Sequence, residues 1–255
     1  MEPFRKEKKP IHRVLILILV VVILLVAVSY TFETNVPASC TNVFVNGDLS
    51  NVDVVFLANN YESVLDFKSD VNSYIDRNGL HNGLLSIDPF KSNAFRFNFY
   101  LVEELFDLEC FTGKDYLLCN HRKVKSIASA CPHDYVIVLS KHSVFDDSAF
   151  LRSSAYLDMA TLNTADNRLV LAHEFGHLFG DLADEYITGE YYVDAPNCDV
   201  VTCPKWYGLF DDVGCFQGCT AINMYRPTEN SIMRDYSQTN SYGPLNENVL
   251  LRKLL

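Results

Sequence analysis

The sequence is poor in basic residues. It contains 21 Lys and Arg against 32 Asp and Glu, which gives a formal net charge of −11. Because a cluster of the basic residues lies before position 14, the rest of the chain is more acidic still. This balance argues against nucleic acid as a partner, since nucleic-acid-binding surfaces are basic.

Internal repeats are also lacking, and no low-complexity tract follows the apolar N-terminal segment. The absence of both favours one compact domain over 33–255 rather than a modular array. No serine or cysteine has a paired His/Asp context, so nucleophilic catalysis has no support. Paired C-x-x-C spacings are missing too, and this disfavours a structural zinc held by cysteines.

A long hydrophobic run occurs once. Residues 14–32 carry no charge and follow a basic head at 1–13. At about 1.5 Å per residue in a helix, this segment nearly spans a bilayer core, and the basic head is expected to stay in the cytoplasm. We therefore predict a transmembrane signal anchor at 14–32 and an extracytoplasmic domain at 33–255. A cleaved signal peptide, with a secreted product, is the alternative because the run is short and Ala27 and Ser29 are small.

The eight cysteines all follow the apolar segment, and their even number predicts disulfides outside the cytoplasm. Pairing within Cys198–Cys219 and within Cys40–Cys131 is expected, although the sequence leaves the connectivity open. The cysteines are Cys40, Cys110, Cys119, Cys131, Cys198, Cys203, Cys215 and Cys219.

Hydrophobic periodicity predicts a mixed α/β layer with a long helix packed beneath the sheet. That helix is expected at 166–179, with Thr164 as its cap and Gly180 as its terminator. An earlier helix is expected at 63–77, ended by Asn78-Gly79. The predicted strands are 51–58, 93–102, 135–139 and a shorter edge strand at 155–162.

The segment HEFGHLFGDLADEY, residues 173–186, carries the most specific chemistry. Helical residues four apart share a face, so His173 and His177 can offer two imidazoles to one metal ion. Glu174 lies beside this pair, where it can contact a metal-activated water without binding the metal. We predict Zn²⁺ as the cofactor and Glu174 as the general base.

A catalytic zinc site usually has three protein ligands, so one is still needed. Asp184 is the preferred candidate, followed by Glu185 and then Asp181. On a straight helix Asp184 would lie about 10 Å beyond His177 along the axis, so the chain has to reverse. A left-handed Gly180 could end the helix and fold the chain back beneath the metal. If Asp184 binds, Glu185 is expected to orient an imidazole.

This segment resembles the zinc motif of the IgA-peptidase-type metallopeptidases, which are metzincin-like enzymes with Gly and then Asp-Glu after the second histidine. The segment 230–236 (NSIMRDY) is similar to the metzincin Met-turn. The resemblance implies a metzincin-like fold with His173, His177 and Asp184 as ligands, Glu174 as base and Met233 beneath the site. It also implies that Tyr236 stabilises the oxyanion, whereas packing on the core is the alternative for this side chain. The common metzincin pattern has a third histidine at the position of Ala183, and here the chain departs from it.

These features predict a membrane-tethered zinc endopeptidase that cleaves peptide or protein substrates laid along an edge strand above the metal helix. A non-catalytic, zinc-stabilised binding domain is one alternative, and a hydrolase of non-peptide amides such as cell-wall components is another. An immunoglobulin substrate is not carried over, because fold and family do not determine the substrate. Trp206, Tyr207 and Phe210 could either line a substrate pocket or fill a small core around the disulfides.

Overall fold

The computed structural model describes residues 18–23, 38–48, 50–145, 147–189, 192–210 and 212–255. These residues divide into two units, within 1–37 and 38–255. In the first unit, 18–23 are helical, and most of the predicted anchor at 14–32 lies outside the described residues. Among the residues described, no helix combines the length and apolar character needed to cross a membrane.

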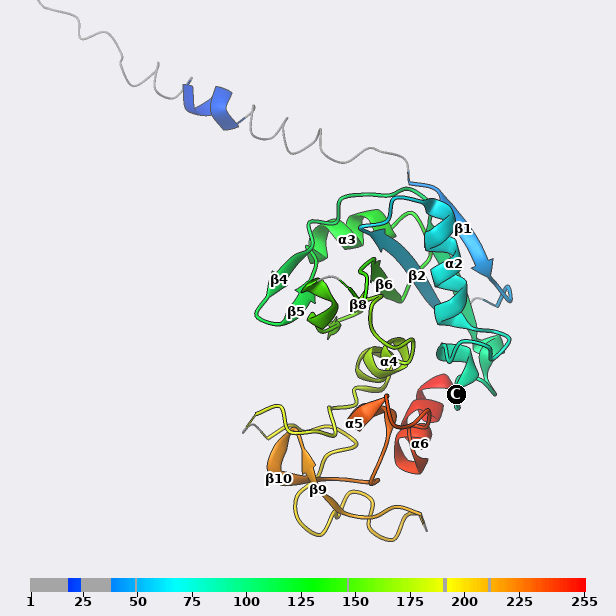
Figure 1. Cartoon of the computed structure of the whole chain (residues 1–255), viewed down its shortest axis with the longest axis vertical. Coiled ribbons are helices and arrows are strands. Elements are labelled where there is room, and N and C mark those ends of the chain that lie inside the picture. The colour runs from blue at the N-terminus through cyan, green and yellow to red at the C-terminus, as the bar shows by residue number, and fades with distance from the viewer. Residues whose placement is uncertain (1–17, 24–37, 49, 146, 190–191, 211) are drawn as a thin grey trace, which may run out of the picture. The chain divides into compact units, whose positions relative to one another are not determined.

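The second unit is built on a six-stranded mixed sheet with strand order β1-β3-β2-β6-β8-β7 (Figure 1). The four inner strands run parallel, and the two outer strands, β1 and β7, are antiparallel to their neighbours. The mixed sheet agrees with the predicted fold class. The strands are β1 (Cys40–Phe44), β2 (Val52–Asn59), β3 (Phe97–Val102), β6 (Tyr135–Ser140), β7 (Ser154–Tyr156) and β8 (Met159–Asn163).

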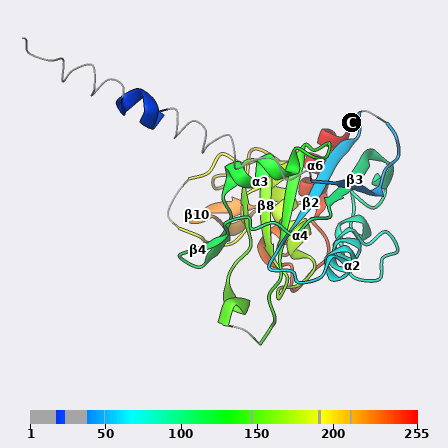
Figure 2. The ribbon, with the colours of Figure 1, turned by 90° about the horizontal axis from the view of Figure 1, so that it is seen from above.

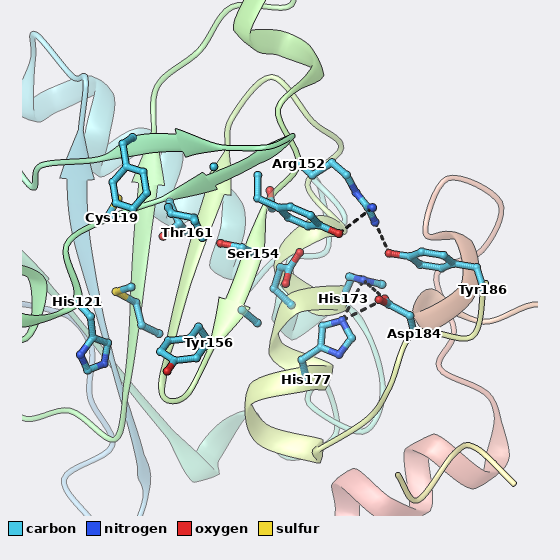
Figure 3. Close-up of a pocket in the computed structure, with 18 residues that line it drawn as sticks. Cys119, His121, Arg152, Ser154, Tyr156, Thr161, His173, His177, Asp184 and Tyr186 are labelled. Carbon is cyan, nitrogen blue, oxygen red and sulfur yellow. Dashed lines mark hydrogen bonds and ion pairs between the residues drawn. The ribbon is translucent and has the colours of Figure 1, made fainter. Parts of the chain in front are cut away.

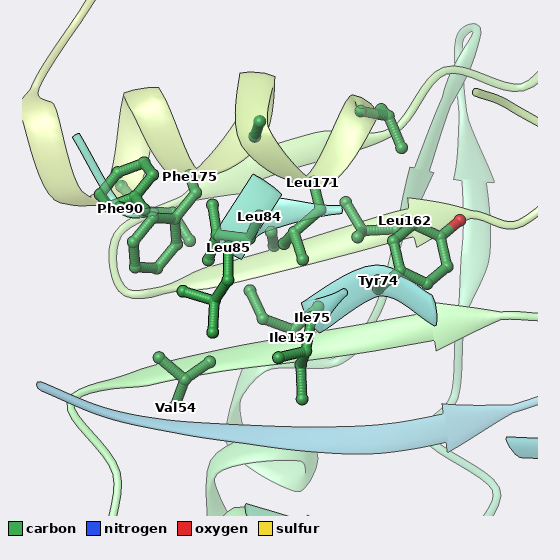
Figure 4. Packing of buried hydrophobic residues seen from close by; sticks show 14 of the residues in the cluster. Val54, Tyr74, Ile75, Leu84, Leu85, Phe90, Ile137, Leu162, Leu171 and Phe175 are labelled. Atoms are coloured by element: carbon green, nitrogen blue, oxygen red, sulfur yellow. The ribbon is translucent and has the colours of Figure 1, made fainter. Parts of the chain in front are cut away.

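Both faces of the sheet are buried, which explains why its inner strands are continuously apolar. Successive side chains of a strand point to opposite faces. In β2, Val54 and Phe56 belong to one hydrophobic cluster, whereas Val55 and Leu57 belong to another. The first cluster is the larger one, and Figure 4 shows its side chains filling the space between the strands and the helices above them.

Helices cover the two faces of the sheet unequally. Helices α2 (Val64–Ile75) and α4 (Val170–Gly180) contribute to the larger cluster, and α3 (His121–Ala128) contributes to the smaller one. Figure 2 shows α2 and α3 on opposite sides of the strands. Helix α4 lies between the sheet and the C-terminal helices α5 (Ile232–Asp235) and α6 (Pro244–Leu254), as Figure 1 shows. The helix that carries the metal motif is therefore packed from both sides.

The strand predictions at 51–58 and 135–139 correspond to β2 and β6. The predicted strand at 93–102 is shorter than expected, because Ala94–Arg96 forms a 3₁₀ turn before β3 begins. The predicted edge strand at 155–162 is wrong as a single strand. It is a hairpin in which β7 and β8 flank a turn at Leu157 and Asp158, and Leu157 takes a positive φ of 55°.

The helix prediction at 63–77 is close, since α2 is capped by Ser63 and ends at a left-handed Asp76. The prediction at 166–179 starts too early, because α4 begins at Val170 and Thr164 is not its cap. Side chains preceding the helix bind nearby backbone N–H groups instead. Asn163 accepts from Ala165, and Asn167 accepts from Leu169. Such local bonds compete with helical ones and hold 164–169 in turns.

Four disulfides confirm the prediction made from the cysteine count. The irregular segment after α4 contains two of them, together with the hairpin β9 (Phe216–Cys219) and β10 (Ala221–Arg226). A third joins β1 to the loop before β6, and the fourth closes the base of the hairpin β4 (Phe111–Gly113) and β5 (Tyr116–Leu118). The pairs are Cys40–Cys131, Cys110–Cys119, Cys198–Cys219 and Cys203–Cys215.

Candidate active site

Helix α4 packs against the core with one face and lines a pocket with another. Leu171, Phe175 and Phe179 project into the larger cluster, where the rings of Phe175 and Phe179 stack 5.4 Å apart. His173 and His177 lie on another face, which lines a pocket with Glu174. Because hydrophobic packing fixes the helix on the sheet, the orientation of the two imidazoles is fixed with it.

Each imidazole is held by a backbone carbonyl. Nδ1 of His173 lies 2.9 Å from the carbonyl oxygen of Ile232, and Nδ1 of His177 lies 2.6 Å from that of Leu182. A carbonyl can only accept, so each neutral ring carries its proton on Nδ1. Both Nε2 atoms therefore present a lone pair to the pocket, as metal-binding histidines do when a hydrogen bond fixes their tautomer.

The chain reverses directly after α4 and returns Asp184 to the histidines. The sequence had indicated a left-handed residue at Gly180. The reversal occurs instead one residue later, at Asp181, which has a left-handed φ of 52°. The N–H of Leu182 then donates to the carbonyl of Gly176. Gly180 instead allows close packing, because a Cβ there would lie 2.8 Å from a methyl carbon of Leu250 on α6.

The Nε2 atoms of His173 and His177 and the Oδ1 of Asp184 form a nearly equilateral triangle. The two nitrogens are 3.3 Å apart, and Oδ1 lies 3.2 Å from the first and 3.3 Å from the second. Ligands about 2.0–2.1 Å from a tetrahedral zinc ion lie about 3.3 Å from one another. Oδ1 of Asp184 is also buried without a hydrogen-bond partner among the described residues. The three residues therefore fit three corners of a tetrahedral metal site.

This triangle is the one group of three or more His, Cys, Asp or Glu side chains in the described part of the chain whose donor atoms converge closely enough for a metal ion. Asp181 points elsewhere and pairs with Lys253 on α6. Of the three carboxylates considered as third ligand, only Asp184 reaches the histidines.

The site is electrostatically prepared for a cation. Burial raises the pKa of Glu174, and the two histidines oppose that shift. Burial also opposes charge on His177 and Asp184, but their mutual attraction prevails. It raises the pKa of His177 to about 9 and holds the pKa of Asp184 well below its usual range. A half-buried carboxylate facing two imidazoles creates a field that favours a positive ion.

Glu185 does not contact either imidazole, contrary to the expectation that it orients one of them. Its side chain is buried, and its carboxylate accepts three hydrogen bonds from separate segments. Oε1 accepts from Asn197 at 3.0 Å and from Asn246 at 2.8 Å, and Oε2 accepts from Ser231 at 2.5 Å. Burial nevertheless raises the pKa of Glu185. The residue therefore ties the loop that carries Asp184 to the segment around α5 and to α6.

The segment that resembles a Met-turn packs directly against α4. Met233 is fully buried, and a Cβ at Gly176 would lie 2.5 Å from its sulfur atom. Gly176, the fourth residue of HEFGH, therefore lets the two segments approach this closely without displacing the Met233 side chain. The same segment supplies the Ile232 carbonyl that holds His173.

Tyr236 lies beside the site, and its hydroxyl is engaged elsewhere. Its ring centroid is 5.2 Å from that of His173, and the hydroxyl donates to Asp166 at 2.7 Å. The ring also packs against the larger hydrophobic cluster. An oxyanion role for Tyr236 remains a prediction that requires its hydroxyl to leave Asp166.

The two histidines, Glu174 and Asp184 open into a pocket of about 680 Å³ (Figure 3). Its walls come from α4, the edge strand β7 and the β4–β5 hairpin. Arg152 and Tyr186 stand over the metal triangle, and sequence reasoning missed both of them as pocket residues. Tyr186 is the last residue of the motif segment 173–186, whereas Arg152 lies in a serine-rich stretch without any local pattern.

Of the two roles considered for the aromatic residues after the zinc motif, the structure favours packing around the disulfides. Trp206 is buried beside Cys203 and Leu245, and Phe210 packs against the same cluster. Tyr207 is exposed. None of the three lines the pocket, so the described structure favours a small core around the disulfides.

Comparison with known proteins agrees with the motif. No curated protein matches the chain significantly. The profile of the family described as IgA Peptidase M64 matches 104–199, a range that includes the β4–β5 hairpin, β7, α4 and Asp184. The resemblance stated from the sequence is thereby confirmed: residues 104–199 of this chain match the IgA peptidase M64 family, a family of peptidases.

Proposed function

We propose that the chain is a zinc-dependent, metzincin-like endopeptidase in which His173, His177 and Asp184 bind the metal and Glu174 is the general base. The observation that carries this proposal is the triangle of donor atoms with sides of 3.2–3.3 Å. Its dimensions suit tetrahedral zinc, and its two nitrogens and one oxygen are typical zinc donors. All three residues line the pocket, so a metal ion held by them would be accessible from it, as catalysis requires.

A bound zinc ion supplies Lewis acidity, which polarises a peptide carbonyl and lowers the pKa of an adjacent water to about 7. Glu174 adjoins the two histidines in the pocket wall, so it can accept the proton of that water. The same carboxyl can then protonate the leaving amine. Its raised pKa suits this exchange, because a carboxyl titrating closer to neutrality both accepts and returns a proton readily.

The pocket and the edge strand beside it supply the place for the substrate. In the described sheet β7 is an outermost strand, and Ser154, Ala155 and Tyr156 line the pocket beside the metal triangle. An extended peptide could therefore pair with β7 and carry its scissile bond over the site. Four disulfides support action outside the cytoplasm. Attachment to the membrane through 14–32 remains part of the proposal.

The retained Glu174 favours catalysis over a purely structural zinc site. A structural site closes its fourth position and has no use for an adjacent buried carboxylate. Burying that carboxylate lowers the stability of the fold, and a binding domain would have no function to offset this cost.

Peptide hydrolysis tests the proposal. The purified full-length chain is incubated with a diverse peptide mixture and zinc, and new termini are identified by mass spectrometry. Glu174→Ala is the active-site variant, and Glu62→Ala is a control at an exposed position outside the pocket. New termini should appear with the wild type and the control and vanish with Glu174→Ala. Folded, zinc-loaded protein that cleaves nothing would instead favour the binding domain or the non-peptide hydrolase.

A further inference from the structure

Arg152 is the only lysine or arginine that lines the pocket in the described structure. It lies two residues before the edge strand β7, on the side of the pocket next to His173 and Asp184 (Figure 3). The pocket wall that it shares also contains Phe111, Leu118 and Met159, which are apolar. Arg152 thus places a guanidinium in a partly apolar recess beside the proposed catalytic centre, whose Glu174 and Asp184 carboxylates line the same pocket.

Two tyrosines hold this guanidinium in place. Nη1 donates to the hydroxyl of Tyr116 at 3.0 Å, and Nη2 donates to the hydroxyl of Tyr186. The guanidinium carbon also lies 5.0 Å from the ring centroid of Tyr116 and 5.5 Å from that of Tyr186. These contacts restrict the rotation of a long side chain before any ligand arrives, and such preorganisation favours binding.

No carboxylate forms an ion pair with Arg152 in the described part of the chain, although the charge of Asp184 acts on it at longer range. None of the ten ion pairs there includes it. The two tyrosine hydroxyls are neutral and use two of the five N–H donors of the guanidinium. The remaining donors can bind another acceptor. Because the side chain is exposed, a ligand in the pocket can reach it.

We propose that Arg152 determines specificity by binding a carboxylate of the peptide substrate, in a protein whose proposed function is peptide hydrolysis. The carboxylate belongs either to an Asp or Glu side chain near the scissile bond or to the C-terminus of a short peptide. A fixed, planar guanidinium matches a carboxylate in geometry and charge. A neutral amide in the same place has one acceptor oxygen instead of two and carries no charge.

Matched peptides test the assignment. Quenched fluorescent peptides are made with Glu or Gln at one position on either side of a central bond, and each is made with a free C-terminal acid or an amide. Values of kcat/KM are measured for the full-length wild type, Arg152→Gln and Arg252→Gln. Arg252→Gln removes the same charge at an exposed position of α6, away from the pocket.

The wild type should cleave peptides with the recognised carboxylate about tenfold to hundredfold faster than their neutral partners, the usual contribution of a charged hydrogen-bonded pair. Arg152→Gln should lose this preference and keep its rate on neutral peptides, whereas Arg252→Gln should resemble the wild type. The Glu/Gln and acid/amide comparisons identify which carboxylate is bound.

Three results would overturn the assignment: a wild type without the preference, a preference that survives in Arg152→Gln, or an equal loss on charged and neutral peptides. Peptide binding to the Glu174→Ala chain tests the role of Arg152 separately from the proposed peptidase activity. Dissociation constants for the same peptides should differ about tenfold or more between acidic and neutral forms, even if nothing is cleaved. Equal dissociation constants there would also refute the role of Arg152.

Discussion

Glu185 is expected to be one of the most sensitive positions for stability, although it does not contact the metal triangle. Its carboxylate is 1% exposed and accepts all three of its hydrogen bonds from residues distant in sequence. Glu185→Ala would leave the amides of Asn197 and Asn246 and the hydroxyl of Ser231 without this acceptor. Each buried donor left unsatisfied costs about 1–3 kcal/mol.

We expect Glu185→Ala to lower the free energy of unfolding by about 3–5 kcal/mol, the range typical of removing one partner from a buried charged network. The sum of three separate bonds would be larger, but contacts within one network are not additive. The loss is a large part of the total stability of an ordinary domain, about 5–15 kcal/mol.

Glutamine has nearly the same shape as glutamate, so we expect Glu185→Gln to change the free energy of unfolding much less. Both asparagine amides donate to Oε1, so the glutamine oxygen can occupy that position and keep both bonds. Its nitrogen then faces Ser231, whose hydroxyl can rotate to accept. The expected change is within about 1 kcal/mol.

Urea unfolding measures these differences. The single tryptophan, Trp206, is buried, so its fluorescence reports loss of the C-terminal core, and circular dichroism reports the rest. Glu229→Ala, at an exposed position, is the control and should change stability by less than about 0.5 kcal/mol. A loss below about 1 kcal/mol for Glu185→Ala, or equal losses for Ala and Gln, would refute the network as the cause.

Further predictions concern the metal, the helix packing and pH. Asp184→Asn should weaken zinc binding by more than about a hundredfold in a chelator competition. Losing only a hydrogen-bond partner of a ligand already lowers metal affinity by about tenfold to hundredfold. An unchanged affinity would show that Asp184 is not a ligand. Gly176→Ala should destabilise the chain by about 1–3 kcal/mol, because the added methyl group overpacks against Met233. The better helix propensity of Ala offsets part of this loss. A gain in thermal stability would contradict the contact with Met233. Burial alone would raise the pKa of Asp70, but hydrogen bonds from Lys141 and Tyr61 and the nearby Arg168 charge hold it below its usual value. A depressed pKa in the folded state stabilises above the unfolded value of about 3.9, and this stability is lost as the pH falls through the folded value. Asp70→Asn should therefore be less stable near neutrality and lose less stability on acidification, and parallel pH profiles would disprove the pairing.

Local patterns in the sequence determined the parts of this protein that depend on short-range geometry. The four-residue spacing of His173 and His177 was sufficient to place two imidazoles on one helix face, since helical geometry is the same in any context. Continuous apolar runs likewise indicated the buried strands β2 and β6. The even cysteine count in an acidic chain with an apolar N-terminal segment indicated disulfides, but it could not indicate which cysteines pair.

Tertiary structure alone decided how distant segments meet. The left-handed turn at Asp181 brings Asp184 rather than Glu185 to the histidines. The family resemblance indicated Asp184, but helical geometry by itself did not distinguish between the two adjacent carboxylates. Asn197, Ser231 and Asn246 converge on Glu185 from three separate segments. Arg152 reaches the pocket because the β7–β8 hairpin folds against α4, whereas its own neighbours in the chain show no pattern. Such contacts depend on the packing of the whole core, so periodicity within ten or twenty residues cannot reveal them.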